Sequence, residues 1–396
     1  MNPAGPRRLA VVLSHPTQYY SPWFRWLQAH NGLQLRVFYL WEFGVTVQRD
    51  PKFQTEFKWD VDLLSGYESE FVPNQSRRPG TEHFGGLRNP ALTARLGAWR
   101  PEAVLLFGYA YASHLQVIGW ARRHGVPLIF RGDSHFIGRP APAWWRALPL
   151  RFLYRQFAAV TYVGQANRDY FTTLGVPSAR LFFAPHAVDQ ALFDPAPAAP
   201  RAAAAALRGA LGIAPATRVV LFAGKFIAAK QPQELLAAFL ALNRPGTALV
   251  LAGDGPESGR LRETARQAPA GRIHFLPFAN QSEMPARYHL ADIFALPSRG
   301  QYETWGLAVN EAMHLGVPCL VSDRVGCQPD LVTDGETGWV FRADDPADLR
   351  AKLDQALGAD LTAFQPRLAG RMAGYTYAAA TRGLEQALAS LGRTNP

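Results

Sequence analysis

Short apolar runs alternate with segments of helical periodicity along most of this 396-residue chain, and the alternation starts twice. Apolar runs of about four to eight residues, bounded by turn residues, are typical of strands buried in a parallel sheet. Strands that alternate with helices predict such a sheet with helices on both of its faces. The runs of the first half are residues 9–13, 33–40, 103–107, 126–130, 158–163 and 180–184, and those of the second half are residues 218–223, 248–252, 273–276, 293–296, 319–322 and 339–341. The expected fold class is therefore α/β, with two Rossmann-like, doubly wound domains.

A proline-rich stretch, DPAPAAPR at residues 194–201, separates the two halves. Prolines among small residues make a stiff linker. We therefore predict an N-terminal domain over residues 1–193, a C-terminal domain over residues 194–373, and a separate helical segment over residues 374–396. Ligands of open α/β sheets bind beyond the carboxyl ends of the strands, so the cleft between the two domains is the expected site.

Residues 41–89 depart from the alternation. This stretch is aromatic, polar and rich in glycine, and it shows no regular apolar run. We interpret it as an insertion or a long loop, and loops of that length in compact domains are usually functional or disordered.

The formal net charge of +10 favours anionic partners such as nucleotides, nucleic acid or acidic lipid, without choosing among them. Cys319 and Cys327 have neither metal-ligand spacing nor a secretory context, so we expect them to be buried thiols in a reducing compartment. The apolar run at 9–13 is too short for a signal peptide. The segment 103–121 contains His114 and other polar residues, and it is interpreted as a strand, a loop and a helix rather than a membrane span. A cytoplasmic location follows as the expectation.

Two carboxylates, Glu303 and Glu311, lie in the stretch SRGQYETWGLAVNEAMHLGVP at residues 298–318. Gly316 and Pro318 end a predicted helix, so that Glu303 lies in the loop before this helix and Glu311 lies inside it. The unpaired N–H groups of the first helical turn and the helix dipole favour an anion there. A phosphate site between two hydroxyl-binding carboxylates suits a nucleotide sugar. Taken alone, the spacing favours the alternative, a loop and a helix with one solvated Glu and one Glu near the helix N-terminus.

Two lysines lie in the loop that follows the first apolar run of the second half, in the sequence GKFIAAKQP. Lys225 and Lys230 precede a helix that begins at Pro232, and both cations can reach one diphosphate. A pair of solvated surface lysines is the alternative interpretation.

Together these elements resemble family 4 of the retaining glycosyltransferases, which combines a G-[RK]-x4-K element with an E-x7-E signature. The resemblance covers residues 215–345 well and residues 9–190 moderately. It implies the GT-B arrangement of two facing domains, with a last helix that crosses back onto the first domain. In that family the first Glu lies beside the donor sugar, the second binds the ribose, and the basic pair holds the diphosphate in place of a metal ion.

The resemblance implies Glu303, Lys225, Lys230 and Asp133 as catalytic residues, with no metal ion and no cofactor besides the donor substrate. It implies a donor-binding set made of Gly224, Phe278, Ala279, Asn280, Thr304, Trp305, Gly306, Leu307 and Glu311. The backbone of residues 278–281 is expected to read the base. Because main-chain contacts do not reveal which base is read, uracil, guanine, adenine and thymine all remain open.

Asp133 and His135 follow the apolar run 126–130, at the place where the family carries a His or an Asp on the acceptor side. The resemblance implies that Asp133 faces the leaving group or the acceptor hydroxyl, with His135 as its rival. A turn capped by Asp133 is the alternative. The opening HPTQYYSP lacks the glycine pair common in the family, but it resembles a subset associated with polysaccharide and lipopolysaccharide clusters. It supplies three further acceptor-side candidates, His15, Gln18 and Tyr19.

Residues 134–168 contain no acidic residue, and arginines are interleaved with aromatic residues between 139 and 157. Aromatic rings and cations suit the headgroup region of an anionic membrane. An ordinary core helix with a solvated basic face is the alternative. Members of the family often use lipid-linked acceptors, so we predict a peripheral position on the cytoplasmic face of the inner membrane.

The expected activity is transfer of a hexose-type sugar from a nucleoside diphosphate sugar to a glycan or lipid-linked acceptor, in polysaccharide or lipopolysaccharide synthesis. The resemblance implies retention at the anomeric carbon by front-side attack, and we expect no nucleic-acid partner. A sugar-nucleotide epimerase of similar two-domain fold and a catalytically silent nucleotide-sugar-binding subunit are the alternatives. A dinucleotide dehydrogenase is disfavoured, because no G-x-G-x-x-G follows Leu13.

Overall fold

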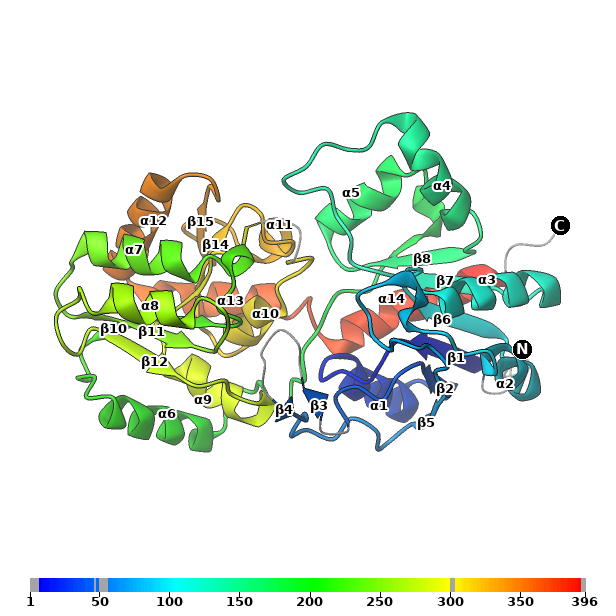
Figure 1. The fold of residues 1–396 in the computed structure, drawn as a ribbon, viewed down its shortest axis with the longest axis horizontal. Helices are drawn as coiled ribbons and strands as arrows, with labels where there is room; N and C mark the ends of the chain where they lie inside the picture. Colours follow the sequence, from blue (N-terminus) through cyan, green and yellow to red (C-terminus); the bar gives the residue numbers. More distant parts are fainter. Residues whose placement is uncertain (1–6, 46–47, 50–55, 300–302, 393–396) are drawn as a thin grey trace.

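The computed structural model of the chain describes residues 7–45, 48–49, 56–299 and 303–392 (Figure 1). Two α/β domains lie side by side, the first at the right of Figure 1 and the second at the left. Each is built on a parallel sheet with helices on both faces, which confirms the predicted fold class.

The first sheet has seven strands in the order β5-β2-β1-β6-β7-β8-β9. All neighbours in it are parallel. The direction of winding reverses between β1 and β6, and the carboxyl ends on either side of such a switch point open a crevice for ligands. The strands are β1 (Arg8–Leu13), β2 (Gln34–Tyr39), β5 (Glu68–Phe71), β6 (Ala103–Phe107), β7 (Leu128–Arg131), β8 (Ala159–Tyr162) and β9 (Leu181–Phe183).

The interpretation of residues 41–89 as an insertion or long loop is wrong in one respect, because β5 is an edge strand of the first sheet and pairs with β2. None of the side chains of β5 is fully buried, so the strand has no continuous apolar run to reveal it. The same stretch holds a short antiparallel pair, β3 (Gln48–Arg49) and β4 (Glu56–Phe57). Residues 46–47 and 50–55 lie outside the described part of the chain.

Helices cover both faces of the first sheet. Alternate residues of each strand face opposite sides, so that Val11 and Leu105 belong to one apolar cluster while Val12 and Leu106 belong to another. The helices and 3₁₀ turns are α1 (Tyr20–His30), η1 (Phe84–Gly86), α2 (Leu92–Trp99), α3 (Ala112–His124), α4 (Trp144–Tyr154), α5 (Gln165–Thr173) and η2 (Ser178–Arg180).

The last helix, α14 (Tyr377–Leu391), returns to the first domain, as the family resemblance implied (Figure 1). Its Leu384 and Leu388 are buried in the same cluster as Leu9 of β1. The buried indole nitrogen of Trp23 donates a hydrogen bond of 3.1 Å to Thr381 Oγ1. The core of the first domain is therefore completed by the end of the chain.

The second sheet has six parallel strands in the order β12-β11-β10-β13-β14-β15, with its switch point between β10 and β13. Four of these strands have the predicted bounds, namely β10, β12, β13 and β14. The strands are β10 (Arg218–Ala223), β11 (Thr247–Ala252), β12 (Ile273–Leu276), β13 (Ile293–Leu296), β14 (Cys319–Ser322) and β15 (Gly338–Phe341). The two cysteines are buried, free thiols, as expected.

The predicted linker is shorter than expected, because α6 (Ala198–Ala210) begins inside it. Alanine has the highest helix propensity of all residues, and the run that follows Pro200 is almost entirely alanine. The remaining helices and 3₁₀ turns of this domain are η3 (Ala228–Lys230), α7 (Pro232–Leu242), α8 (Ser258–Ala265), η4 (Gln281–Glu283), α9 (Met284–His289), α10 (Leu307–His314), α11 (Gln328–Leu331), α12 (Pro346–Gly358), η5 (Leu361–Phe364) and α13 (Gln365–Met372).

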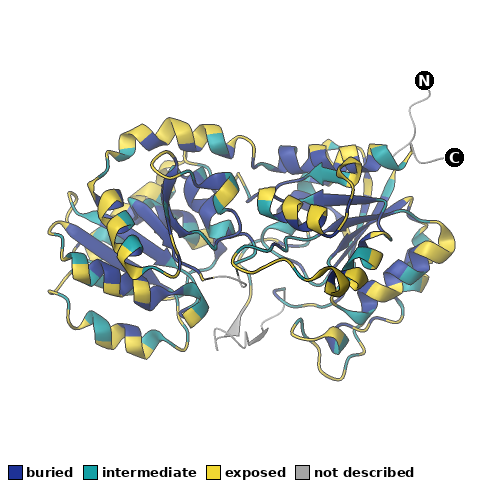
Figure 2. Cartoon of the chain, turned by 90° about the horizontal axis from the view of Figure 1, so that it is seen from above, coloured by how far each residue is buried: buried dark blue, intermediate teal, exposed yellow. Residues whose placement is uncertain are grey.

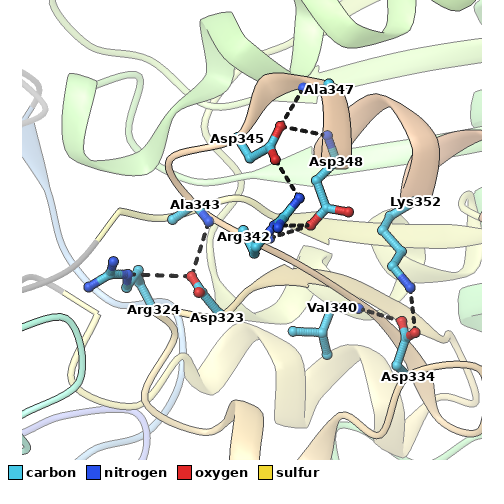
Figure 3. A network of polar contacts seen from close by, with 10 residues as sticks. All are labelled: Asp323, Arg324, Asp334, Val340, Arg342, Ala343, Asp345, Ala347, Asp348 and Lys352. Atoms are coloured by element: carbon cyan, nitrogen blue, oxygen red, sulfur yellow. Dashed lines mark hydrogen bonds and ion pairs between the residues drawn. The ribbon is translucent and has the colours of Figure 1, made fainter.

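A polar network fixes the loops at the carboxyl ends of β14 and β15 (Figure 3). Asp345 caps α12 by accepting hydrogen bonds of 3.0 Å from the N–H groups of Ala347 and Asp348. Asp323 accepts from the N–H of Ala343 at 3.0 Å and lies 3.4 Å from Arg324. The ion pair with Asp323 holds Arg324 beside Gly138 of the first domain, where a Cβ atom would overlap the guanidinium.

The two domains approach each other closely at Gly164. A Cβ atom there would overlap the indole of Trp305 and would lie 2.6 Å from a carboxylate oxygen of Asp330. The N–H of Gln165 donates to both oxygens of Asp330, at 3.0 and 2.9 Å. In Figure 2 the buried residues are concentrated in the strands and on the inner faces of the helices of each domain.

Candidate functional site

Glu303 and Lys230, both predicted to be catalytic, form an ion pair in the cleft between the domains. The Glu303 side chain is 12% exposed and the Lys230 side chain 22%. Ser298 Oγ donates a second hydrogen bond of 2.9 Å to the same carboxylate oxygen. The pair joins the 3₁₀ turn η3, after β10, to the loop before α10, so the two motifs meet in space.

Gly306 and Trp305 set the position of α10. Gly306 is the residue before the helix and has a φ of 101°, and a Cβ there would lie 2.9 Å from Val325 and 3.1 Å from Leu296. Only glycine adopts that conformation in that space at little cost. The buried indole N–H of Trp305 donates to Asn310 Oδ1 at 2.7 Å. The first turn of α10, which starts at Leu307, therefore points its free N–H groups toward the loop that carries Glu303.

Glu311 is 3% exposed and is surrounded by hydrogen-bond donors. Gln281 Nε2 donates to it at 2.9 Å, the Tyr288 hydroxyl donates at 2.6 Å, and the Tyr19 side chain is a third partner. Burial raises the pKa of Glu311 despite these hydrogen bonds, which act in the opposite direction. A carboxylate offers about four lone-pair sites, so three donors leave room for one more hydroxyl.

A pocket of about 150 Å³ opens above Glu311. The second domain contributes Gly224, after β10, and Phe278 and Ala279, after β12, all three of which belong to the predicted donor-binding set. The first domain contributes three residues to the same lining, Gln18, Tyr19 and Trp59. Two of the predicted acceptor-side candidates thus lie in one pocket with predicted donor-binding residues.

Two predicted residues are near this pocket but do not line it. Asn280 uses its side chain in a capping box with Glu283 and in a hydrogen bond of 2.8 Å to the carbonyl of Lys58. Lys225 follows Gly224 and is half-buried, before the fully buried Phe226.

Asp133 reaches across the cleft to the loop that carries Glu303. Its carboxylate accepts a hydrogen bond of 2.8 Å from Thr304 Oγ1 and lies 3.6 Å from Nε2 of His186, which is buried. Burial alone would raise the pKa of Asp133, but the interactions with His186 and Thr304 outweigh it and lower the pKa. Burial lowers the pKa of His186, against the opposite effect of Asp133. The alternative interpretation was that Asp133 only caps its own turn, but its carboxylate also accepts a hydrogen bond from Thr304 of the second domain.

His135 also contacts this loop. Its Nδ1 accepts from the N–H of Ile137 at 3.1 Å, which assigns the proton to Nε2, and Nε2 lies 3.4 Å from the carbonyl oxygen of Glu303. Burial lowers the pKa of His135. Asp133 and His135, two of the five residues that the sequence placed on the acceptor side, therefore contact the same loop.

His15 lies among aromatic rings. Its ring is edge-on to Trp41 and Phe43, with centroids 5.9 and 5.3 Å away. Burial lowers the pKa of His15 to about 4, so the ring is uncharged at neutral pH. This environment suits a neutral hydrogen-bonding or packing role.

Sequence reasoning missed several residues of the site, among them Trp59, His186 and Tyr288, and it gave Gln281 a backbone role only. The side chain of Gln281, which donates to Glu311, was not predicted, although its backbone belongs to the stretch 278–281 that the resemblance implied. Among the described residues, no three His, Cys, Asp or Glu side chains are grouped closely enough to hold a metal ion.

Comparisons with known proteins place the chain among transferases. The family model "Glycosyl transferases group 1" matches residues 204–368. The chain is 31% identical over 278 residues to a GDP-mannose-dependent alpha-(1-6)-phosphatidylinositol monomannoside mannosyltransferase of Mycolicibacterium smegmatis, an alignment that covers 66% of this chain and 70% of that protein. It is 35% identical over 183 residues to a D-inositol 3-phosphate glycosyltransferase of Mycolicibacterium gilvum, but there it covers 45% of this chain and only 39% of the relative.

Among solved structures, HepE of Anabaena in complex with UDP and glucose has a TM-score of 0.71. The superposition covers 97% of this chain and all of HepE at 17% sequence identity, and this likeness shows the fold alone.

Proposed function

The chain belongs to the group 1 glycosyl transferases, and from that premise we propose that it moves a sugar from a nucleoside diphosphate sugar to a glycan or lipid-linked acceptor. The observation that carries the proposal is the Lys230–Glu303 ion pair beside Gly224, which also lines the pocket. A cation for the diphosphate and a carboxylate for the sugar hydroxyls are thereby held next to a pocket that residues of both domains line.

The donor occupies this cavity with its ribose near Glu311 and its base near Phe278. Glu311 retains one lone-pair site for a ribose hydroxyl, and Phe278 and Ala279 offer apolar surface and backbone to the base. The relative from Mycolicibacterium smegmatis is GDP-mannose-dependent, whereas HepE was solved with UDP. The base and the sugar of the donor of this protein therefore stay open.

Transfer proceeds with retention, by attack from the face that the leaving group departs from. The bond between the anomeric carbon and the β-phosphate oxygen breaks, and the acceptor oxygen forms its bond on that same face. The departing phosphate oxygen takes the proton of the acceptor hydroxyl. The protein contributes orientation and charge stabilisation, with Lys230, Lys225 and the N–H groups at the start of α10 facing the diphosphate.

Asp133 and His135 hold the loop that carries Glu303 against the first domain. The hydrogen bond from Thr304 to Asp133 and the contact of His135 with the Glu303 carbonyl fix the backbone directly after the Glu303 side chain. An acceptor bound between the domains therefore meets a carboxylate whose position is set by both of them.

We expect binding and turnover to survive excess EDTA, because the charge that develops on the leaving diphosphate is offset by lysines rather than by a metal ion. Thermal unfolding of the protein is followed with a panel of nucleoside diphosphate sugars in EDTA. The matching donor raises the apparent stability, since a ligand that binds only the folded state shifts the equilibrium by mass action. Transfer is then measured with that donor in EDTA.

The same assay separates the other candidate functions. An epimerase would release free nucleotide and an altered sugar without an acceptor, and a silent binding subunit would be stabilised without any turnover. If EDTA abolishes turnover and a divalent cation restores it, the lysines are not the leaving-group stabiliser.

The membrane proposal rests on α4. Four large apolar side chains of this helix are exposed: Trp144 by 70%, Trp145 by 55%, Leu148 by 49% and Phe152 by 63%. Rings at headgroup level beside cations are typical of interfacial helices. We propose that α4 rests on an anionic membrane surface, which would bring a lipid-linked acceptor to the cleft.

Cationic side chains lie around α4, as contact with an anionic membrane surface requires. The guanidinium of Arg146 stacks on the ring of Trp145, and a groove beside the helix is lined by Arg122, Arg155 and Phe152. None of the helices in the described ranges is long and apolar enough to cross a membrane.

Replacing Trp144, Trp145 and Phe152 by alanine should abolish binding to vesicles that contain anionic lipid, measured by co-sedimentation. Binding by the unmodified protein should weaken as salt rises, because each cation near the surface contributes about 1 kcal/mol that salt screens. Arg151 is left in place, since it donates to the carbonyl of Thr173 at 3.3 Å and helps to hold α4.

A matched control replaces Phe84 and Leu115, two exposed apolar residues that are outside α4. This variant should bind vesicles like the unmodified protein. Equal binding to neutral and anionic vesicles would reject the electrostatic part of the proposal, and equal loss in both variants would reject α4 as the contact.

A further inference from the structure

A short strap of the first domain, residues 58–60, lies against a loop of the second domain. Asn280 Nδ2 donates a hydrogen bond of 2.8 Å to the carbonyl of Lys58. The carboxylate of Asp60 accepts from the hydroxyl of Ser282 and from its N–H group at 3.3 Å. The strap follows β4 and so belongs to the stretch that the sequence left without an assigned role.

The partner loop is the beginning of the 3₁₀ turn η4, which follows Phe278 and Ala279. Asn280 and Glu283 close a capping box around this turn, so the backbone that meets Asp60 is rigid. The free N–H groups at the start of such a turn favour a carboxylate, which Asp60 supplies from the other domain. The strap therefore fastens beside the residues that line the base end of the pocket.

Trp59 lines the pocket from the opposite domain. Its N–H donates to the carbonyl of Gly44 at 3.2 Å. Gly44 has a φ of 89°, and a Cβ there would lie 2.8 Å from Cδ1 of the Trp59 ring. Glycine at position 44 thus lets the loop after β2 pack against the indole of Trp59. The indole lines the same pocket that Gly224, Phe278 and Ala279 line from the second domain.

We propose that Trp59 is a wall of the donor pocket against which the base of the nucleotide packs, and that the Asp60–Ser282 contact fastens this wall. The inference rests on the proposed function and extends it, because it makes the first domain a participant in donor recognition. The ligand is a planar nucleobase, and since every base has a π-face, the contact adds affinity without selecting one base.

The test compares Trp59→Ala with the unmodified protein in titrations with UDP, GDP, ADP, TDP and inorganic pyrophosphate, followed by calorimetry. The Kd of the preferred nucleoside diphosphate should rise about tenfold to a hundredfold, as loss of one stacking partner does. The Kd of pyrophosphate, which has no base, should not change. Trp59→Phe keeps an aromatic face and should retain most of the affinity.

Trp26→Ala serves as the matched control, since Trp26 is a half-buried tryptophan of α1 that does not line the pocket. Its nucleotide affinity should equal that of the unmodified protein. Unchanged nucleotide affinity in Trp59→Ala would reject the proposal that the base packs against Trp59. An equal loss of pyrophosphate affinity would show a general disturbance of the site, and would reject the proposal as well. If the unmodified protein binds pyrophosphate but no nucleoside diphosphate, the proposed function fails together with the wall.

Discussion

Replacing Lys230 by alanine is expected to lower kcat/KM by about a hundredfold to a thousandfold, as removal of one preorganised charge from a leaving-group site does. Lys230 is the cation that the structure places in contact with Glu303, and its side chain is mostly withdrawn from water. A charge in such a place acts more strongly than one in solvent, because fewer water molecules screen it. The measurement is steady-state transfer with the donor identified by thermal shift.

One further variant separates the charge of Lys230 from its shape, and two variants of other lysines are compared with it. Lys230→Met keeps an unbranched side chain of similar length, and should fail as badly as alanine. Lys225→Arg keeps a cation and should retain much of the activity. Lys352→Ala removes a lysine that pairs with Asp334 outside the site and should be neutral. Substantial activity in Lys230→Met would show that packing, not charge, is what the site needs from this residue.

Glu303→Ala is expected to lower turnover at saturating donor by roughly a hundredfold or more, since charge-assisted hydrogen bonds to sugar hydroxyls are hard to replace. Glu303→Gln keeps the size of the side chain and a hydrogen bond with Ser298 but loses the charge. Because the loss lies in the transition state, kcat and kcat/KM should fall together. Near-normal turnover in Glu303→Ala would remove this residue from the neighbourhood of the sugar.

The two largest effects are coupled. Lys230 and Glu303 share one ion pair, and residues in one network give non-additive free energies. The double variant should therefore lose less than the sum of the two single losses. Glu336→Ala, at an exposed turn position, is the carboxylate control and should leave turnover unchanged.

Much of the fold followed from the sequence because a parallel sheet with covered faces leaves a direct signal. Continuous apolar runs such as residues 293–296 and 319–322 gave the strand bounds without error, since both of their faces are buried. Edge strand β5 has half-buried side chains and left no such run. Helix α6 was not predicted, because the prolines at its start suggested a linker, and the predicted linker included the first turn of the helix.

The candidate site was predictable where its residues belong to one motif and unpredictable where they meet across the fold. Glu303, Glu311 and Lys230 stood out through spacing. Tyr288 is 23 residues from Glu311 in the chain, and only the fold brings the two side chains together. The same is true of His186, which lies opposite Asp133. Trp59 comes from a stretch without periodicity, so only the three-dimensional structure shows that it lines the pocket.

The return of α14 to the first domain has a consequence for how the protein is made. Trp23 and Thr381, which hydrogen-bond in the finished core, are 358 residues apart in the chain. While the ribosome extends the chain, one face of the first sheet has no covering helix at the place of Leu384 and Leu388. The second domain can close its core before that, because its strands and helices lie between residues 198 and 372. The nascent chain therefore carries an uncovered apolar face until the last helix leaves the ribosome, and exposed apolar surface of this kind is where chaperones act.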